Sequence, residues 1–266
     1  MKTVVITGSA RGFGLALAKE FKKNNFNVVL SDINIERLEK AEKELRASAG
    51  SGQVFAVDAD IVSYESVKRL WRLAEKKFVS IDIWINNAGV NQPDKPIYEL
   101  TEEEVDIVLN VDLHGAIYGS QVAFKKMKEQ GFGQIYNVEG YGSNDAMMTG
   151  LNIYGTSKRA ITHFTKALAK ESEDLGANVQ VGRLSPGIMI TDFLTSANGE
   201  DGSFELSEKT KKVYNILGDY PEPIAAFMVS KIAANKKNNV RFNWLTNFKA
   251  FTRFLMPWKK RDFFNK

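Results

Sequence analysis

A tyrosine and a lysine four residues apart, Tyr154 and Lys158, are the side chains in this sequence best suited to acid–base chemistry. Residues at positions i and i+4 share one face of a helix, so the ammonium group should lie beside the phenol. A free phenol, with a pKa of about 10, is a poor base at neutral pH, and a neighbouring positive charge brings its pKa toward the working range. The pair is therefore predicted to move a proton at an oxygen atom of a substrate.

A glycine-rich segment near the amino terminus predicts a phosphate-binding turn. Gly8, Gly12 and Gly14 follow an apolar run at residues 3–7 and precede a helical pattern. Phosphates need clustered N–H donors and close approach of the backbone, which glycines and a helix amino terminus supply. An ordinary glycine-rich turn is the alternative, and it is disfavoured because the next predicted strand ends in an acid, Asp32.

The elements that position these residues follow a regular order. Apolar runs of four to six residues alternate with helical patterns, which is typical of βαβ units. The near-continuous Val/Ile/Leu content of the runs suits strands covered by helices on both faces. We therefore predict an α/β protein with a single doubly wound Rossmann fold and a mostly parallel sheet. The predicted strands are 3–7, 27–31, 54–57, 81–86, 133–138 and 178–184, and the predicted helices are 13–24, 35–47, 64–77, 101–130 and 154–173.

Composition excludes several kinds of site. The 266 residues are 44% hydrophobic, which fits one domain with a sizeable core. The sequence has no cysteine and two histidines without paired spacing, so disulfides are excluded and no metal site is expected. A strand begins almost at Met1, and no run of about 18 apolar residues occurs. We therefore expect a cytoplasmic protein without a leader or membrane span.

The glycine turn and the Tyr-x-x-x-Lys pair, taken together and in this order, resemble the short-chain dehydrogenase/reductase family. Further markers of that family are Asp60, the run Asn86-Asn87-Ala88-Gly89, and Pro186-Gly187 with Thr191. The resemblance covers at least residues 1–192. It implies a nicotinamide cofactor and either the reduction of a carbonyl group or the oxidation of the corresponding alcohol.

The resemblance also implies which positions meet the cofactor. Asp60 matches the acid that contacts the adenine, although it could also cap the helix that follows. The small residues after Asn86 would let the backbone approach the nicotinamide ribose, and Thr191 would hold the carboxamide. The predicted cofactor-binding residues are Gly8, Ser9, Arg11, Gly12, Phe13, Gly14, Asp32, Asp60, Ile61, Asn87, Ala88, Gly89, Tyr154, Lys158, Pro186, Gly187, Ile188 and Thr191.

Two residues have opposite effects on the choice of nucleotide. Asp32 can accept hydrogen bonds from both ribose hydroxyls and would repel a 2′-phosphate. In this family, a basic residue at the position of Arg11 often meets that phosphate. Because repulsion between like charges costs more than one solvated arginine contributes, NAD(H) is favoured and NADP(H) is the alternative.

Two positions depart from the catalytic pattern of the family. The strand motif that normally ends in Asn-x-Ser-Ser reads Asn137-Val138-Glu139-Gly140, so a glycine stands where the catalytic serine is expected. Asp112 replaces the usual asparagine and can still receive Lys158 through water. We expect Ser143, or failing that Asn144, to turn inward and supply the missing hydroxyl or donor, and a turn-capping role is the alternative for Ser143. The predicted catalytic residues are Tyr154, Lys158, Ser143 and Asp112.

One branch of the family shares the first departure. Chlorophyll b reductases carry an acid-Gly-x-Gly-Ser run here, and this chain reads Glu139-Gly140-Tyr141-Gly142-Ser143. The run Phe242-Asn243-Trp244-Leu245-Thr246 is also similar to that branch. Those enzymes reduce the formyl group of a large, flat macrocycle with NADPH, whereas Asp32 departs from their nucleotide preference. The resemblance implies a carbonyl reductase with a bulky apolar substrate. The alternatives are a general ketone or 3-oxoacyl reductase, and a cofactor-binding protein that has lost turnover and acts as an NAD(H) sensor or scaffold.

The chain is predicted to comprise a core at residues 1–192, a mobile substrate lid at 193–230 and a basic aromatic extension at 231–266. Residues 241–266 hold seven Lys or Arg against one acid, Asp262. Such a segment can lie on an anionic bilayer, or it can pack over the pocket or against a second subunit. Packing is favoured, because aromatic residues are usually buried. No nucleic-acid-binding motif accompanies the charge, so the expected partners are a small-molecule substrate and a second copy of the chain. The basic, aromatic and leucine residues that give this segment its character are Arg241, Phe242, Trp244, Leu245, Phe248, Lys249, Phe251, Arg253, Phe254, Leu255, Trp258, Lys259, Lys260, Arg261, Phe263 and Phe264.

Overall fold

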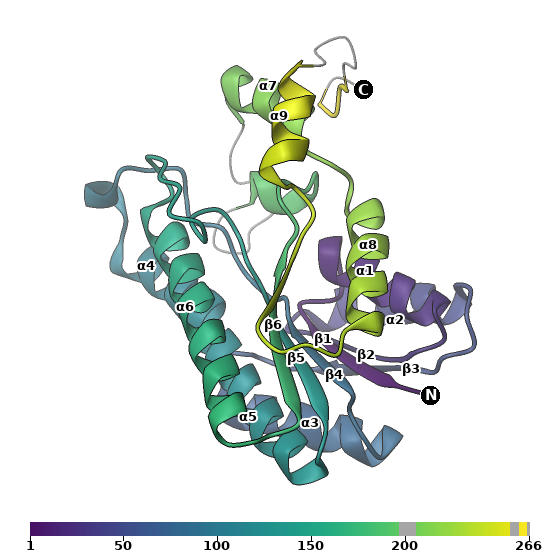
Figure 1. Cartoon of the computed structure of the whole chain (residues 1–266). Helices are drawn as coiled ribbons and strands as arrows, with labels where there is room; N and C mark the ends of the chain where they lie inside the picture. Colours follow the sequence, from purple (N-terminus) through teal and green to yellow (C-terminus); the bar gives the residue numbers. More distant parts are fainter. Residues whose placement is uncertain (197–205, 256–260, 265–266) are drawn as a thin grey trace.

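The strands of the protein form one parallel sheet. In the computed structural model, which describes residues 1–196, 206–255 and 261–264, the sheet has seven strands in the order β3-β2-β1-β4-β5-β6-β7 (Figure 1). Each neighbouring pair runs parallel. The predicted doubly wound Rossmann fold is thus confirmed. The strands are β1 (Thr3–Thr7), β2 (Asn27–Asp32), β3 (Val54–Asp58), β4 (Ile83–Asn86), β5 (Gly133–Val138), β6 (Val179–Ser185) and β7 (Val240–Asn243).

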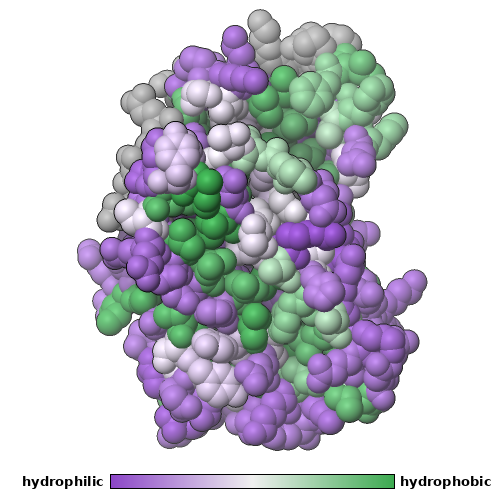
Figure 2. Space-filling model, turned by 90° about the vertical axis from the view of Figure 1, so that its left-hand side faces the viewer, coloured by the Kyte–Doolittle hydropathy of each residue, from purple (hydrophilic) through white to green (hydrophobic). Residues whose placement is uncertain are grey.

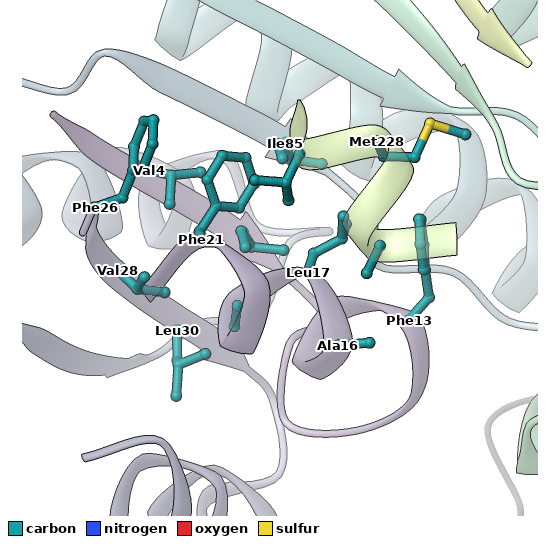
Figure 3. Close-up of a cluster of buried hydrophobic side chains, with 14 of the residues drawn as sticks. Val4, Phe13, Ala16, Leu17, Phe21, Phe26, Val28, Leu30, Ile85 and Met228 are labelled. Atoms are coloured by element: carbon teal, nitrogen blue, oxygen red, sulfur yellow. The ribbon is translucent and has the colours of Figure 1, made fainter. Parts of the chain in front are cut away.

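Helices cover both faces of the sheet. Along β1, Val4 and Ile6 enter the core on the side of α1 and α8, while Val5 enters the core on the side of α3, α5 and α6. Figure 3 shows Phe21 of α1 lying between Val4 and Ile85. The α-helices are α1 (Gly12–Lys23), α2 (Ile35–Ala47), α3 (Tyr64–Phe78), α4 (Glu102–Val108), α5 (Gly115–Gln130), α6 (Asn152–Asp174), α7 (Glu208–Leu217), α8 (Pro221–Ala234) and α9 (Asn247–Leu255). Within the described ranges, none of the helices is both long and apolar enough to cross a bilayer.

The helix predicted at residues 101–130 is interrupted. It begins with the expected capping box, in which Thr101 and Glu104 bond each other's backbone amides. After α4 the chain enters a π-helical segment at Leu109–His114 before α5 begins. Such π-helical segments are often found at functional sites. Here the segment carries Asp112, which is only 2% exposed.

Part of the segment predicted as a lid, residues 193–230, lies in the core. Residues 221–230 belong to α8, whose Ile224, Met228, Val229 and Ile232 are fully buried in the core shared with α1. The boundary at 230 is therefore wrong, because this apolar helix face completes the layer that covers one side of the sheet. Strand β7 likewise joins the sheet at its edge by pairing with β6, so the extension is part of the fold.

Asp219, between α7 and α8, anchors the C-terminal segment. Its carboxylate accepts hydrogen bonds from Trp244 Nε1 at 2.6 Å, from Arg253 Nη2 at 2.7 Å and from Arg261 Nη1 at 2.7 Å. The backbone of Asp219 bonds Ile188 and Ile190, in the segment after β6. The C-terminal segment is therefore connected to the chain that follows the sixth strand.

The aromatic residues of this segment divide into two groups. Trp244 packs edge-to-face on Phe227, and Phe263 packs on Tyr220, as the packing alternative predicted. Phe248, Phe251, Phe254 and Leu255 of α9 are instead exposed, because Arg253 of the same helix faces inward toward Asp219. Within one chain these side chains of α9 are thus not buried, and their packing against a second subunit stays a prediction. Trp258, Lys259 and Lys260 lie outside the described residues.

Candidate functional site

The glycine turn forms one wall of a cleft of about 520 Å³ at the carboxyl ends of the strands. Gly8 and Gly12 have φ angles of 60° and 54°, in the left-handed region that favours glycine. A Cβ atom on Gly14 would overlap Gly8 O and lie 2.6 Å from Asn87 Nδ2. The turn is thus as tight as the family's phosphate-binding turn requires, and its residues fit a dinucleotide cofactor.

The segment after β4 fixes this turn. The side-chain amide of Asn87 donates to Thr7 O at 3.0 Å and to Gly8 O at 2.9 Å, and the backbone amides of Asn87 and Ala88 both donate to Thr7 Oγ1. A Cβ atom on Gly8 would lie 2.6 Å from Ala88 Cα. Asn87 thus holds the two loops together in addition to lining the cleft.

Most of the predicted cofactor residues line this cleft. They are Gly8, Arg11, Gly12, Phe13, Gly14, Asp32, Asp60, Ile61, Asn87, Ala88, Gly89, Tyr154, Lys158 and Thr191.

Four predicted residues are placed elsewhere. Ser9, Pro186, Gly187 and Ile188 are outside the described lining of the cleft. The Ser9 hydroxyl is fully buried and bonds Ile6 O and Ser31 N, so this side chain ties the turn to β2. Gly187 lies against Leu245, to which a Cβ atom on Gly187 would come within 2.7 Å. The Ser9 hydroxyl thus bonds other parts of the fold, and cofactor contact by Pro186, Gly187 and Ile188 stays a prediction.

Several residues of the cleft were not among those predicted from the sequence. Met189 and Ile190 continue its wall after β6, and Arg37 and Tyr220 enter from α2 and from the residue before α8. Arg37 lies about one helical turn beyond the end of β2, so its place near Asp32 could have been deduced from spacing. No sequence signal indicated Tyr220, which reaches the cleft from a distant part of the chain.

Two acids at strand ends bond backbone amides. Asp32 Oδ2 accepts from Ala10 N at 3.3 Å and its Oδ1 accepts from Asn34 N at 3.1 Å, which connects β2 to the glycine turn. Asp60 Oδ1 accepts from Val62 N at 3.0 Å. The cap of α3 is Ser63, so the alternative role of Asp60 as a helix cap is wrong.

Tyr154, Lys158 and Asp112 form a buried group at the inner end of the cleft. Lys158 Nζ lies 2.9 Å from Asp112 Oδ2 and 5.2 Å from the centre of the Tyr154 ring. Asp112 Oδ1 also accepts a hydrogen bond of 2.7 Å from Val90 N. The structure thus brings the predicted carboxylate into direct contact with Lys158, where bridging through water was expected.

Burial determines how these groups ionise. Burial raises the pKa of Tyr154 to about 12, against the opposing effect of Lys158 and with smaller contributions from Asp112 and Tyr214. Burial also raises the pKa of Asp112. Burial alone would lower the pKa of Lys158, but Asp112 and Tyr154 outweigh it, so the pKa of Lys158 is raised. At neutral pH this places a protonated phenol beside a charged lysine.

Gln92, which sequence reasoning missed, fixes the start of α6. Its Oε1 accepts hydrogen bonds from Ile153 N at 2.8 Å and from Tyr154 N at 2.9 Å, and its side chain is fully buried. These amides belong to the first helical turn, which has no partner within the helix. Gln92 therefore holds the backbone of Tyr154 itself.

We expect Gln92→Leu to lower the free energy of unfolding by about 1–3 kcal/mol, because a cap is lost and two amides stay buried. Turnover should fall with it, because Tyr154 loses its backbone anchor. Chemical denaturation and steady-state kinetics measure the two effects. Gln134→Leu is the control, because it removes a half-buried glutamine of β5 that lies away from Tyr154. Equal losses of turnover in both variants would contradict the role of the cap.

Ser143 does not take the place of the missing catalytic serine. Its hydroxyl accepts from Gly140 N at 3.1 Å and donates to Lys158 O at 3.3 Å, and the residue is 4% exposed and outside the described lining of the cleft. The expected inward turn of Ser143 is therefore wrong, and the turn-capping alternative holds. Asn144, the second choice, is exposed to solvent.

The space at Gly140 is already filled. A Cβ atom there would overlap Tyr154 Oη and lie 3.0 Å from Lys158 Cγ. Gly142 is equally close to its neighbours, since its Cβ atom would lie 2.5 Å from Gly155 Cα. The two glycines let the loop after β5 pack directly against α6.

A family model described as short chain dehydrogenase matches residues 2–202. The chain belongs to the short-chain dehydrogenase family. As a member of it, the protein is an NAD(P)-dependent oxidoreductase.

Two plant relatives of this short-chain dehydrogenase confirm the predicted branch. It is 35% identical to chlorophyll(ide) b reductase NOL of Oryza sativa subsp. japonica, over 94% of this chain and 73% of that protein. It is 31% identical to the probable chlorophyll(ide) b reductase NYC1 of Arabidopsis thaliana, over 98% of this chain. The chain spans 54% of that second relative, which is about half its length.

A solved structure with the same fold contains a nicotinamide cofactor. The 3-ketoacyl-(acyl-carrier-protein) reductase of Brucella melitensis, complexed with NADH, is 26% identical and superposes with a TM-score of 0.77. The alignment covers 93% of this short-chain dehydrogenase and 98% of that chain.

A second hollow of about 840 Å³ runs along α6 of this short-chain dehydrogenase. Met147, Met148 and Leu151 line it from the loop, and Ala160 and His163 line it from the helix. Figure 2 shows this side of the molecule, where hydrophobic residues form a band down the middle. Its described lining includes neither Tyr154 nor Lys158, so it is separate from the cofactor cleft.

Proposed function

We propose that this short-chain dehydrogenase reduces a carbonyl group and that Tyr154 gives the proton to the carbonyl oxygen. The observation that carries the proposal is a phenol in the cleft, 5.2 Å from the ammonium group of Lys158 as measured to the ring centre. A bound reduced nicotinamide would supply the hydride. Tyr154 would complete the reaction with its proton.

The ionisation of Tyr154 favours the direction of reduction. Burial raises the pKa of this phenol to about 12, so it carries its proton at neutral pH and is ready to donate. Lys158 would stabilise the phenolate that remains, and Asp112 would hold Lys158 in place from 2.9 Å. Lys158 would also hold the hydroxyls of the nicotinamide ribose, as the family resemblance implies.

The missing serine leaves Tyr154 as the hydrogen-bond donor that we assign to the carbonyl oxygen. Its hydroxyl occupies the space beside Gly140, where the family's serine side chain would otherwise lie. We propose that one phenol both polarises the carbonyl and protonates it. This is a smaller set of donors than the family normally uses, and it fits a substrate whose carbonyl is an aldehyde, which is more reactive than a ketone.

The substrate that we propose is bulky and apolar, as in the chlorophyll b reductase branch. Support comes from two relatives in that branch that align with nearly the whole chain. The ring of Phe193 lies 6.1 Å from that of Tyr154 and would offer an apolar surface beside the reacting group. We also propose that residues 193–196 and 206–220 cover the substrate.

A panel of carbonyl compounds tests the substrate class. Wild-type enzyme with NADH or NADPH should reduce a formyl-tetrapyrrole faster than small ketones or 3-oxoacyl thioesters. A preference for the thioesters would favour the general ketone or 3-oxoacyl reductase. Tight cofactor binding without turnover on any compound would favour the NAD(H) sensor or scaffold. This non-enzymatic alternative is retained because position 140 is a glycine and not the catalytic serine. Cytoplasmic location and a homo-oligomeric state stay predictions.

Asp32→Ser is expected to change the nucleotide preference, which we propose is for NAD(H). The carboxylate lines the same cleft as Arg11 and Arg37, and a 2′-phosphate there would face all three groups. Removing the like charge should lower the NADPH-to-NADH ratio of dissociation constants by about tenfold or more. Fluorescence titration measures both constants. Glu36→Gln, an exposed acid on α2, is the matched control, and a wild-type preference for NADPH would show that the arginines outweigh Asp32.

A further inference from the structure

Glu139 is a buried acid at the end of β5, beside Gly140. Its side chain is only 1% exposed, and it lines the cofactor cleft. A buried carboxylate is costly unless charged or hydrogen-bonding partners compensate it. The partners of Glu139 therefore show which parts of the fold depend on it.

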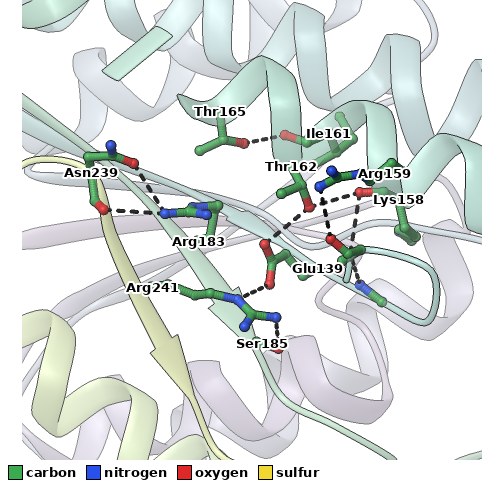
Figure 4. Close-up of polar contacts among 12 residues, drawn as sticks. Glu139, Lys158, Arg159, Ile161, Thr162, Thr165, Arg183, Ser185, Asn239 and Arg241 are labelled. Carbon is green, nitrogen blue, oxygen red and sulfur yellow. Dashed lines mark hydrogen bonds and ion pairs between the residues drawn. The ribbon is translucent and has the colours of Figure 1, made fainter. Parts of the chain in front are cut away.

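Three neighbouring elements supply those partners. Arg241 of β7 places Nε 2.6 Å from Glu139 Oε2, and Thr162 of α6 places its hydroxyl 3.1 Å from Oε1 (Figure 4). Arg241 also donates from Nη2 to Ser185 Oγ at the end of β6. The carboxylate thus connects the ends of three strands to the helix that carries Tyr154 and Lys158.

The contact with α6 falls one turn after Lys158. The hydroxyl of Thr162 lies 3.1 Å from Lys158 O as well as 3.1 Å from Glu139 Oε1, so it can bond either oxygen. The loop after β5 reaches the same carbonyl oxygen through Ser143. The turn of α6 that bears Lys158 is therefore fastened both to the strand end and to the loop.

The charge of Glu139 also acts on a second arginine. Arg183 of β6 donates to Asn239 O and Oδ1, and burial lowers its pKa while Glu139 opposes that effect. Arg241 contributes to lowering the pKa of Arg183, because the two positive charges repel. Without the carboxylate, two arginines would face each other in a half-buried site.

We propose that Glu139 is a positioning residue that sets the separation between α6 and β5. It acts through Thr162 and Arg241. At this separation the Tyr154 hydroxyl fills the space beside Gly140. We call Glu139, Thr162 and Arg241 the clamp. Because position 140 has no side chain to define that separation, the distance between strand and helix must be set elsewhere. The proposal rests on the proposed function of Tyr154 as proton donor.

Four variants separate positioning from general stability. Glu139→Leu and Arg241→Met each leave a charge without its partner and should lower the unfolding midpoint, whereas the double variant should recover most of it. Thr162→Val keeps the shape of the side chain and removes the hydroxyl that reaches Glu139 Oε1 or Lys158 O, while the pair of Glu139 with Arg241 stays intact. In single turnovers at saturating NADH, all four should reduce the hydride-transfer rate about tenfold, because small displacements of a catalytic group are costly.

The decisive comparison is the double variant. A double variant that is stable but slow supports the clamp, because stability and rate then separate. Recovery of the rate together with the unfolding midpoint would overturn the proposal, as would an unchanged rate in Thr162→Val. Glu129→Gln removes the exposed pair with Lys126 at 2.8 Å and is the control that should change neither quantity.

Hydrogen exchange tests the clamp without a substrate. Amides of residues 140–145 and 152–158 should exchange faster in the double variant and in Thr162→Val than in wild type, while those of β1 stay unchanged. Unchanged exchange in the loop and at the start of α6 would overturn the clamp. If wild-type enzyme reduces no carbonyl in the panel, the proposed function fails, and the exchange result still decides the clamp.

Discussion

Replacing Tyr154 by phenylalanine should abolish measurable reduction while cofactor affinity stays close to that of wild type. The ring, its contact with Phe193 and its place beside Lys158 are kept, and only the hydroxyl is lost. Positioned general acid catalysis typically contributes about 10²- to 10⁴-fold in rate. Because Tyr154 is also the donor that we assign to the carbonyl oxygen, the loss should lie toward the upper end of that range.

The measurement is kcat on the best carbonyl of the panel, together with the NADH dissociation constant from fluorescence. Tyr118→Phe is the matched control, because this half-buried phenol stacks on His114 away from the cleft. Retained turnover in the Tyr154 variant would remove the proposed proton donor. A large loss of NADH affinity would show that the hydroxyl acts mainly in cofactor binding.

Restoring the family's serine should damage the enzyme. The Cβ atom of Gly140→Ser would overlap Tyr154 Oη, so the phenol or the strand end must move. A displacement of about 1 Å at a catalytic group can cost roughly 10²-fold in rate, and we expect a loss of that order. The sequence shows only that the family's serine is missing at this position, and the overlap with Tyr154 Oη appears only in the folded structure.

Gly140→Ala isolates the steric effect and should lose activity to a similar extent. Gly155→Ala adds a Cβ atom next to Tyr154 in the chain, but this atom would meet Gly142 Cα at an ordinary 3.8 Å. That variant should stay active and is the control for a methyl group added near the site. Higher turnover in Gly140→Ser than in wild type would show that the Tyr154 hydroxyl moves aside at little cost.

Local patterns made much of the fold predictable. Six strands, the glycine turn and the spacing of Tyr154 and Lys158 depend on neighbours in the chain, and the periodicity of apolar residues reveals such elements. The direct contact of Asp112 with Lys158 was not predictable, because Asp112 lies on a π-helical segment that breaks the helical spacing.

Long-range contacts account for the other errors. Gln92 caps a helix 61 residues away, and Arg241 pairs with a carboxylate 102 residues away. Asp219 attracts Arg253 and so turns the aromatic face of α9 outward. Each of these contacts depends on how the strands and helices pack, which no window of sequence contains.

The shared space at Gly140 and Tyr154 also constrains how this enzyme can change by mutation. We expect a serine at position 140 to be tolerated only if α6 also moves away from β5, because its Cβ atom would otherwise overlap Tyr154 Oη. Effects of neighbouring substitutions that share one space do not add, so the two changes are accessible together but not one at a time. We therefore expect that a single substitution does not easily introduce a working serine at position 140.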